Sequence, residues 1–194
     1  MSDDRLPRTI LSEVPWSGRI MSVHVDRLEL PNGAVVEREA VRHPKVSAVV
    51  AIDADRCILM VREYRHPAGR TFLQIPSGLR EPGEEAEDCA RRELMEETGF
   101  ACQRLERLIG LFPSPGVSDE WLDVFLATDL HRVGSPLPEG EQGVLELVVV
   151  PLEEAVSMAA SGRLLDAKTV IAVLLAGCRM GVDPCRPFRL EGRD

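Results

Sequence analysis

The stretch that decides the fold is residues 78–100, which read G-L-R-E-P-G-E-E-A-E-D-C-A-R-R-E-L-M-E-E-T-G-F. Its first residues are rich in Gly and Pro and predict a loop. A helix is expected to begin near Glu84 and to stop at Gly99, where a C-cap glycine belongs. Acidic residues crowd the first turn, where the helix dipole stabilises negative charge. The segment therefore predicts a loop followed by an acidic helix.

Three glutamates, Glu93, Glu96 and Glu97, share one face of this expected helix. At about 100° per residue the three side chains lie within an arc of about 100°. Like charges at this spacing repel each other by roughly a few tenths of a kcal/mol per pair. A divalent cation would relieve the repulsion, because hard cations such as Mg²⁺ prefer carboxylate oxygens. The pattern by itself leaves two interpretations open, a metal-binding face or the solvated acidic face of a surface helix.

The opposite side of the expected helix carries a narrow apolar stripe, Ala86, Ala90 and Leu94. Residues at this spacing lie above one another on a helix, so the stripe is expected to pack on a sheet. Arg91 and Arg92 lie among the acids in sequence, and we expect both to pair with carboxylates and to orient them.

Strand patterns flank the helix on both sides. Residues 20–30 alternate apolar and polar side chains, Pro31-Asn32-Gly33 marks a turn, and residues 34–41 can return as the second strand of a hairpin. Further strands are expected over residues 46–52, 57–64, 72–75, 105–112, 121–127 and 144–150. Strands before, between and after helices indicate a mixed sheet flanked by helices, an α/β or α+β sandwich.

Two more helices are expected near the C-terminus. Pro151 suits the first position of a helix of about ten residues, and Asp166 suits the N-cap of a last helix over residues 167–178. Residues 134–143 are rich in Gly, Pro and Glu and are expected to form a mobile loop. The expected organisation is an N-terminal β-hairpin subdomain over residues 1–42, a main domain over residues 43–182 and a tail over residues 183–194.

The charge of the chain is acidic and unevenly spread. The 194 residues carry a net charge of −9, and residues 78–100 alone hold eight acids against three bases. An acidic chain is a poor general binder of nucleic acids and of anionic membranes, since both are polyanions. No apolar run reaches the ~18 residues that indicate a membrane span. The concentration of acids favours a local metal site over a general contribution to solubility.

The cysteines and the N-terminus indicate a cytoplasmic protein. The five cysteines are odd in number and include no Cys-x-x-Cys pair, so neither a disulfide framework nor a structural zinc site is expected. The acidic start Met1-Ser2-Asp3-Asp4 leads into no apolar run, so no secretory signal is expected.

Residues 78–100 match the Nudix box, G-x5-E-x7-R-E-U-x-E-E-x-G-U, at every defined position. The matching residues are Gly78, Glu84, Arg92, Glu93, Leu94, Glu96, Glu97, Gly99 and Phe100. A chance match at this composition is on the order of one in a million. The chain thus resembles the Nudix hydrolases, and the resemblance implies an α/β/α sandwich that cleaves nucleoside diphosphates linked to another moiety.

The resemblance assigns roles within the box. It implies that Glu93, Glu96 and Glu97 bind Mg²⁺ or Mn²⁺, with two or more ions per site, and that the backbone carbonyl of Ser77 is a further ligand. Other box residues look structural, because glycines suit the bends and an ion pair can brace the loop against the metal face. These structural residues are Gly78, Glu84, Arg92 and Gly99.

A narrower resemblance extends over roughly residues 18–178. Residues 61–67 (V-R-E-Y-R-H-P) and 75–78 (I-P-S-G) are similar to the V-x-Q-Y-R-x-P and I-P-A-G segments of ADP-ribose pyrophosphatases. Residues 114–120 (S-P-G-V-S-D-E) resemble their S-P-G-x-x-x-E loop, and residues 166–169 (D-A-K-T) resemble the D-x-K-T start of their last helix. Pro115 falls 15 residues after the box, where that subfamily has a proline.

This subfamily resemblance implies further site residues. Glu120 closes the loop and is implied as the catalytic base, with Glu96 as the alternative base. Arg65 can bind a phosphate through its guanidinium fork, although a surface ion pair is the ordinary use of such a residue. Glu63 and Ser77 depart from the Gln and Ala that are usual at these positions.

Arg38-Glu39 is similar to the R-E pair on the second hairpin strand of the same enzymes. There the N-terminal sheet reaches across a homodimer and helps to grip the nucleotide, which implies a two-fold homodimer with Arg38 and Glu39 as substrate-binding residues. Trp16 could stack on adenine, but a lone tryptophan is more often a packing anchor.

The activity implied by the resemblance is divalent-metal-dependent hydrolysis of ADP-ribose to AMP and ribose 5-phosphate. The expected partner is a small nucleoside diphosphate sugar, with no nucleic acid and no membrane. Two alternatives remain: a pyrophosphatase for another nucleoside diphosphate sugar such as GDP-mannose, or a non-catalytic module that senses nucleotides. An intact set of metal carboxylates favours the enzyme, because binding alone does not require all of them.

Overall fold

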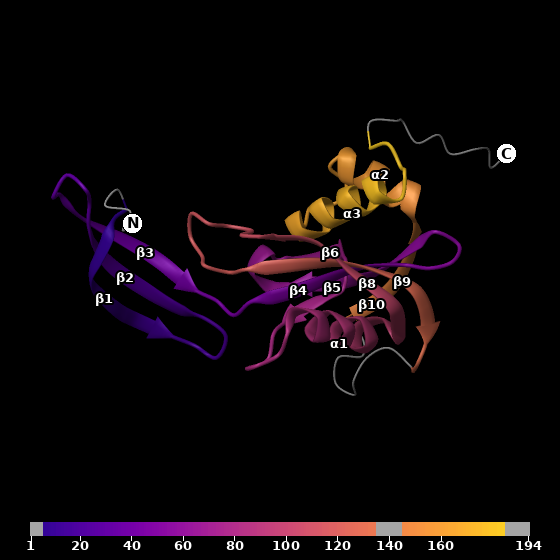
Figure 1. Ribbon diagram of the computed structural model, residues 1–194, viewed down its shortest axis with the longest axis horizontal. Helices are drawn as coiled ribbons and strands as arrows, with labels where there is room; N and C mark the ends of the chain where they lie inside the picture. Colours follow the sequence, from indigo (N-terminus) through magenta and orange to yellow (C-terminus); the bar gives the residue numbers. More distant parts are fainter. Residues whose placement is uncertain (1–5, 135–144, 185–194) are drawn as a thin grey trace. The chain divides into compact units, whose positions relative to one another are not determined.

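The computed structural model of the chain describes residues 6–134 and 145–184. The chain forms two compact units, of which the first consists of Met1–Lys45 with Phe112–Trp121 and the second of Val46–Leu111 with Leu122–Asp194. The colours of Figure 1 follow the sequence and let the two segments of each unit be traced. The segment Phe112–Trp121 therefore belongs to the same unit as the N-terminal strands.

The first unit contains a three-stranded antiparallel sheet in the order β1-β2-β3 (Figure 1). Its strands are β1 (Arg8–Ser17), β2 (Ser22–Glu29) and β3 (Val35–Arg42). The expected hairpin is β2 with β3, and Gly33 has a φ of 80° in its turn, a value that glycine tolerates. The sequence pattern does not predict β1, because this strand is exposed at all ten residues and has two register shifts that interrupt the alternation.

The second unit contains a seven-stranded mixed sheet whose main path runs β10-β5-β4-β9-β8, with β6 on β5 and β7 on β4. Its strands are β4 (Val46–Ile52), β5 (Cys57–Arg65), β6 (Arg70–Gln74), β7 (Ser77–Leu79), β8 (Phe100–Leu111), β9 (Leu122–Arg132) and β10 (Leu145–Pro151). Strands β4 and β9 are parallel. Short β7 falls in the stretch expected to be a loop, where three residues pair with β4.

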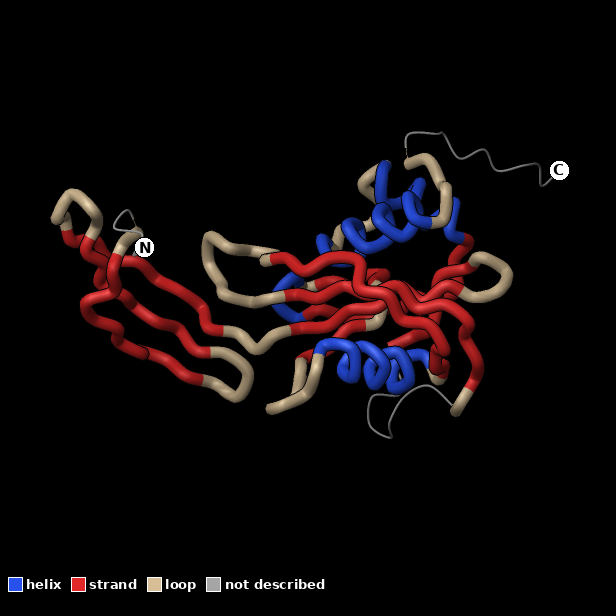
Figure 2. Tube along the Cα trace, viewed as in Figure 1, coloured by secondary structure: helices blue, strands red, loops and turns tan. Residues whose placement is uncertain are grey.

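Helices cover both faces of this sheet, α1 on one face and α2 with α3 on the other (Figures 1 and 2). Their bounds are α1 (Ala86–Thr98), α2 (Leu152–Ala160) and α3 (Ala167–Arg179). Successive residues of β4 alternate between the two layers, since Val49 packs in the cluster of α1 and Val50 in the cluster of α2 and α3. The expected α/β sandwich with a separate N-terminal antiparallel sheet is confirmed.

Several boundaries differ from the expectation, among them the start of α2 and the start of β8. Pro151 is the last residue of β10 and α2 begins one residue later, because β10 pairs with β5 as far as Pro151. Strand β8 begins at Phe100 rather than at Leu105, because its first residues pair with the end of β9. Asp166 accepts the backbone N–H of Thr169 at 3.1 Å, which confirms it as the N-cap of α3.

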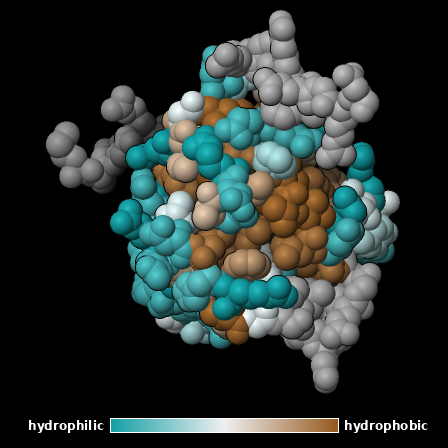
Figure 3. All heavy atoms as spheres, turned by 90° about the vertical axis from the view of Figure 1, so that its right-hand side faces the viewer, coloured by the Kyte–Doolittle hydropathy of each residue, from teal (hydrophilic) through white to brown (hydrophobic). Residues whose placement is uncertain are grey.

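The expected loop at residues 134–143 and the expected tail fall mostly on residues 135–144 and 185–194, which lie outside the described residues. The division of the chain at residues 42 and 182 stays a prediction. Among residues 6–134 and 145–184, no helix has the length and apolar character needed to span a bilayer. On the face shown in Figure 3, hydrophobic side chains gather in one area among hydrophilic ones.

Candidate active site

Helix α1 carries acidic residues of the box, and the opposite side of this helix is buried. Ala90 and Leu94 are fully buried against the sheet, as the apolar stripe predicts. Gly99 ends the helix with a φ of 75°, and its N–H donates to the carbonyl of Met95, a left-handed C-cap that favours glycine. Because Ala90 and Leu94 pack on the sheet, the rotation of α1 about its axis is fixed, and so are the directions of its other side chains.

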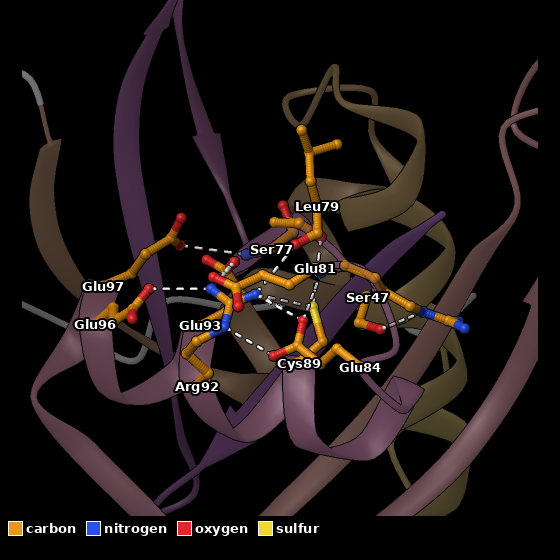
Figure 4. A network of polar contacts seen from close by, with 12 residues as sticks. Ser47, Ser77, Leu79, Glu81, Glu84, Cys89, Arg92, Glu93, Glu96 and Glu97 are labelled. Atoms are coloured by element: carbon orange, nitrogen blue, oxygen red, sulfur yellow. Dashed lines mark hydrogen bonds and ion pairs between the residues drawn. The ribbon is translucent and has the colours of Figure 1, made fainter. Parts of the chain in front are cut away.

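Arg92 lies at the centre of the box and joins the loop to the helix (Figure 4). Its Nε and Nη2 donate to the two carboxylate oxygens of Glu84 at 2.8 and 3.0 Å. Its Nη1 donates to Glu93 Oε1 at 2.6 Å and to Glu96 Oε2 at 3.1 Å, and its Nη2 donates to the carbonyl of Leu79 at 3.1 Å. The hydrogen bonds from Arg92 lower the pKa of Glu84 to about 2. This geometry is that of a brace between the loop and α1.

Arg91 does not pair with the acids, contrary to the expectation. Its Nη1 donates to the carbonyl of Cys102 at 3.0 Å and lies 3.2 Å from the sulfur of the same residue, on strand β8. Adjacent helical residues point about 100° apart, so Arg91 and Arg92 cannot share one set of partners. Of these two arginines, only Arg92 bonds to the box carboxylates among the described contacts.

Gly78 provides the space in which the Glu93 carboxylate lies. A Cβ placed on Gly78 would fall 1.9 Å from Glu93 Oε1, closer than a carbon and an oxygen that are not bonded can approach. Glu93 is 8% exposed, and this burial raises its pKa. Glycine is required at position 78 because the backbone of β7 passes directly over the carboxylate.

Glu97 faces the same loop from the next turn of α1. The backbone N–H of Ser77 donates to Glu97 Oε2 at 3.2 Å (Figure 4). Burial raises the pKa of Glu97 to about 8, with further contributions from the negative charges of Glu93 and Glu63. Burial and neighbouring carboxylates therefore both disfavour the charged form of Glu97.

This donor set fits a divalent cation of the Mg²⁺ type. The box glutamates and the Ser77 carbonyl offer only oxygen ligands, which hard cations prefer, and the raised pKa of Glu93 and of Glu97 marks charge that a cation would neutralise. Within residues 6–134 and 145–184, no three His, Cys, Asp or Glu side chains are gathered closely enough to form a metal site in this conformation. In this conformation Arg92 bonds to Glu93 and Glu96, and the Ser77 N–H bonds to Glu97.

Arg65 ends strand β5 in the same unit and already has a carboxylate partner. Its Nη2 lies 2.8 Å from Glu63 Oε2, and its Nε donates to Gln74 Oε1 at 3.2 Å. Glu63, the departure noted in the sequence, is thus compensated by Arg65. The Arg65 side chain remains 39% exposed, so it is accessible to a ligand.

Glu120 lies in the first unit, on a segment that is hydrogen-bonded to the end of β3. Backbone hydrogen bonds link Val41 with Val117 and Asp119, so the segment continues from the sheet edge. Glu120 Oε2 lies 3.9 Å from His43 Nδ1, and the backbone N–H of Glu120 donates to Ser118 Oγ at 3.0 Å. The structure thus assigns Glu120 and the box glutamates to different units.

Arg38 and Glu39 lie with the same segment in the first unit. They line a cleft of about 410 Å³ together with Phe112, Pro115 and Asp119. Trp16 is on β1 and is 51% exposed. The first unit therefore brings together the sequence-predicted residues Arg38 and Glu39 and the loop of Glu120, whereas the second unit brings together Ser77, Arg65 and the box glutamates.

Sequence reasoning missed two polar residues at the edge of this site. Gln74 is 1% exposed, and Lys168 Nζ donates to its Oε1 at 2.8 Å. A signal for Lys168 was present in the D-A-K-T motif, but the motif indicates a helix start and not a contact. Gln74 stands in an apolar strand pattern, where a single polar residue is the only available signal.

Comparison with known proteins identifies the class. Residues 41–172 match the family model of the NUDIX domain. A solved structure described as an ADP compounds hydrolase superposes with a TM-score of 0.79 at 26% sequence identity, covering 90% of this chain and 94% of that one. The chain belongs to the Nudix hydrolase family.

Two curated relatives are similar to this chain over most of its length. The methanol dehydrogenase activator of Bacillus methanolicus is 40% identical over 166 residues, which cover 86% of this chain and 90% of the relative. The ADP-ribose pyrophosphatase of Bacillus subtilis (strain 168) is 39% identical over 166 residues, with the same coverage of 86% and 90%. The similarity includes nearly the whole length of both relatives.

Proposed function

We propose that this Nudix hydrolase cleaves the diphosphate of ADP-ribose to AMP and ribose 5-phosphate. The observation that carries the proposal is the buried, charge-rich contact of Glu93 and Glu97 with Ser77 and Gly78 of β7, where the raised pKa of Glu97 indicates a place for a cation. The similarity to an ADP-ribose pyrophosphatase at 39% identity supports the choice of substrate.

In this proposal Glu93, Glu96, Glu97 and the carbonyl of Ser77 hold two or more Mg²⁺ or Mn²⁺ ions. Such ions, when bound, neutralise diphosphate oxygens and activate water. The chain's own contribution is to hold the carboxylates in place, and Arg92 and Glu84 do this from the loop side. Binding requires Arg92 to share Glu93 and Glu96 with the ions, because it bonds both side chains in the present conformation.

The proposed base is Glu120, which would remove a proton from the attacking water. Its side chain is 28% exposed and therefore accessible. Glu96 is the alternative base, at 42% exposure, but its Oε2 is bonded to Arg92. Arg65 would bind a phosphate, since its guanidinium presents a fork of donors that matches phosphate oxygens.

The base assignment is tested by Glu120→Gln and Glu96→Gln. If Glu120 is the base, E120Q should lower kcat by about 100-fold or more with little change in the Kd of the nucleotide, because general-base catalysis contributes about 10²–10⁴-fold. Steady-state kinetics and calorimetric titration with AMP measure the two effects. A change of kcat below about threefold in E120Q would assign the base role to Glu96 instead.

We further propose a two-fold homodimer built on the N-terminal sheet. Strand β1 exposes Ile10, Leu11, Val14 and Trp16 at 44–51%, and exposed apolar side chains on one strand are typical of an interface. In this dimer Arg38 and Glu39 of one protomer would help to bind the nucleotide of its partner. The first unit would then be a functional domain that includes residues 1–42.

A cytoplasmic location is part of the same proposal. The described cysteines Cys57, Cys89, Cys102 and Cys178 are all free, which suits a reducing compartment. Burial raises the pKa of the Cys89 thiol to about 11, so this residue is unreactive as a nucleophile.

A substrate panel tests the activity. ADP-ribose, GDP-mannose and other nucleoside diphosphate sugars are incubated with Mg²⁺ or Mn²⁺, and the release of nucleoside monophosphate is measured. Turnover of ADP-ribose at the highest kcat/KM is expected. Preferred turnover of GDP-mannose would replace the substrate, and binding without turnover of any compound would favour the sensor.

A further inference from the structure

A chain of polar contacts connects the start of α3 to Arg65. Its centre is Gln74, the last residue of β6, whose side-chain oxygen accepts two hydrogen bonds from cations. Lys168 Nζ donates to Gln74 Oε1 at 2.8 Å, and Arg65 Nε donates to the same atom at 3.2 Å. Two cationic donors on one oxygen fix the orientation of the amide, since its nitrogen could not take that position. Gln74 Nε2 then lies 3.5 Å from Glu63 Oε2.

Lys168 is held in place by the N-cap of α3. Its Nζ lies 3.0 Å from Asp166 Oδ2, and the side chain is 15% exposed. The same carboxylate oxygen accepts the N–H and the hydroxyl of Thr169 at 3.1 and 2.6 Å. Thr169 Oγ1 in turn accepts the backbone N–H of Ile75 at 3.1 Å. The motif at residues 166–169 therefore contacts Gln74 through Lys168 and the next residue, Ile75, through Thr169.

The charges along this chain of contacts are balanced in pairs. Asp166 neutralises Lys168, and Glu63 neutralises Arg65 through a 2.8 Å contact with Nη2. Arginine has five N–H donors, and among the described residues Arg65 contacts Gln74 through Nε and Glu63 through Nη2. The Arg65 side chain is 39% exposed, so its remaining donors are accessible to a ligand. The contacts with Gln74 and Glu63 therefore orient Arg65 without occupying all of its N–H donors.

We propose that Lys168 is a positioning residue that acts through Gln74 to orient Arg65 toward the diphosphate of the substrate. The inference rests on the proposed function, in which Arg65 binds a phosphate. Without Lys168, Gln74 Oε1 loses one of its two donors and Asp166 loses its cation, so the amide and the guanidinium gain alternative orientations. Arg65 would then spend less time in the orientation that binds phosphate, and substrate binding would weaken.

A purely structural role for Lys168 predicts different kinetics. A structural residue would lower the melting temperature and the amount of active enzyme, which reduces the apparent kcat at constant KM. A positioning residue for a group that binds the ground state raises KM and leaves kcat almost unchanged. In addition, its effect vanishes when the group on which it acts is removed.

The test is a double-mutant cycle with Lys168→Met and Arg65→Ala, assayed on the best substrate of the panel. K168M should raise KM about tenfold, the size of the loss of one charge-assisted hydrogen bond, with kcat within about twofold of the wild type. R65A should raise KM further, and K168M should add less than about twofold in the R65A background. Lys45→Met makes the same chemical change at an exposed position and should leave both constants unchanged.

A second variant covers the case in which K168M melts early. Gln74→Met removes the shared acceptor and leaves both cations in place, so it should raise KM as K168M does, and the two changes together should add nothing. Independent, multiplicative effects of K168M and R65A on KM would overturn the proposal, as would an unchanged KM in K168M. A wild-type protein that hydrolyses no compound of the panel would instead overturn the proposed function, and this inference with it.

Discussion

At the scale of single residues, Gly78 is the position with the least freedom in the site. The space of its missing side chain is filled by the carboxylate of Glu93, so the two residues act as one unit. The first glycine of the box therefore has a steric role that extends to a proposed metal ligand fifteen residues away.

Gly78→Ala is expected to inactivate the enzyme without unfolding it. The added Cβ would lie 1.9 Å from Glu93 Oε1, so the carboxylate must move away from the position in which it is proposed to hold a cation. We expect kcat/KM to fall by about 100-fold or more, since misplacement by about 1 Å can cost that much. Enzyme assays and circular dichroism melts measure this change.

Gly134→Ala is the matched control for this prediction. No heavy atom lies within 4 Å of a Cβ built on Gly134, so this variant should keep wild-type activity. Equal activity of G78A and G134A would contradict the proposed role of the Gly78–Glu93 contact.

Glu97 gives the metal-free protein a pH-dependent stability. Its pKa in the folded protein is about 8, above the ordinary value of 4.5 that applies to the unfolded chain. Between these values the folded state binds a proton that the unfolded state has lost, so the contribution of Glu97 is fully present below about pH 4.5 and is lost as the pH rises to about 8. Glu97→Gln removes this dependence.

In EDTA, E97Q should melt about 3 °C or more above the wild type at pH 8, and within about 1 °C of it at pH 5. Scanning calorimetry over this pH range measures the difference. Adding Mg²⁺ at pH 8 should stabilise the wild type more than E97Q, because ligand binding to the folded state adds to stability. A constant difference at all pH values would argue against the raised pKa of Glu97.

At the scale of elements, the loop before α1 and the helix itself are joined by one side chain. Arg92 spans Glu84 on the loop, the carbonyl of Leu79, and two glutamates one turn apart on the helix. The loop has little apolar surface of its own, so this brace is the main described tie between its middle and α1. The acidic face therefore depends on Arg92 for its shape as well as for its charge.

Arg92→Met should destabilise the protein by about 2–3 kcal/mol, because it leaves Glu84 and Glu93 without their cation. This corresponds to a loss of about 4–10 °C in Tm for a chain of this size. Arg104→Met is the control, since Arg104 is 82% exposed and exposed ion pairs contribute about 0–1 kcal/mol. Melting temperatures of the two variants that agree within error would refute the brace.

At the scale of the whole molecule, the proposed machinery is divided between two units. The segment of Glu120 is hydrogen-bonded to the edge of β3, whereas the box glutamates belong to the seven-stranded sandwich. If Glu120 is the base, as we propose, activity on the proposed substrate requires both units, and a dimer through the N-terminal sheet would make it depend on assembly as well.

Val14→Glu tests this dependence. A charge among the exposed apolar residues of β1 should oppose association and shift the protein from dimer to monomer, since burying an unpaired charge is costly. Light scattering after size exclusion measures the mass, and kcat/KM should fall with the dimer fraction. Gln103→Glu adds the same charge to an exposed position on β8 and should change neither quantity. A wild-type protein that remains monomeric at micromolar concentration would refute the dimer.

The sequence by itself determined the local parts of this protein. The spacing of Ala90, Leu94 and the box glutamates already separates a buried side of α1 from an acidic one, and Asp166 and Gly99 already mark helix ends, because these features depend on residues within one or two turns. The β-branched run at β4 likewise predicts a buried strand. The sequence pattern did not predict strand β1, because its exposure removes the alternation of apolar and polar side chains on which such a prediction depends.

Only the tertiary structure decided which of these parts meet. Arg91 and Arg92 are neighbours in sequence, yet one bonds to β8 and the other to the box, because the packing of α1 on the sheet points them apart. Gln74 and Lys168 are 94 residues apart in sequence and share a contact because β6 ends beside the start of α3. Such contacts follow from strand register and layer packing, which no local pattern of residues encodes.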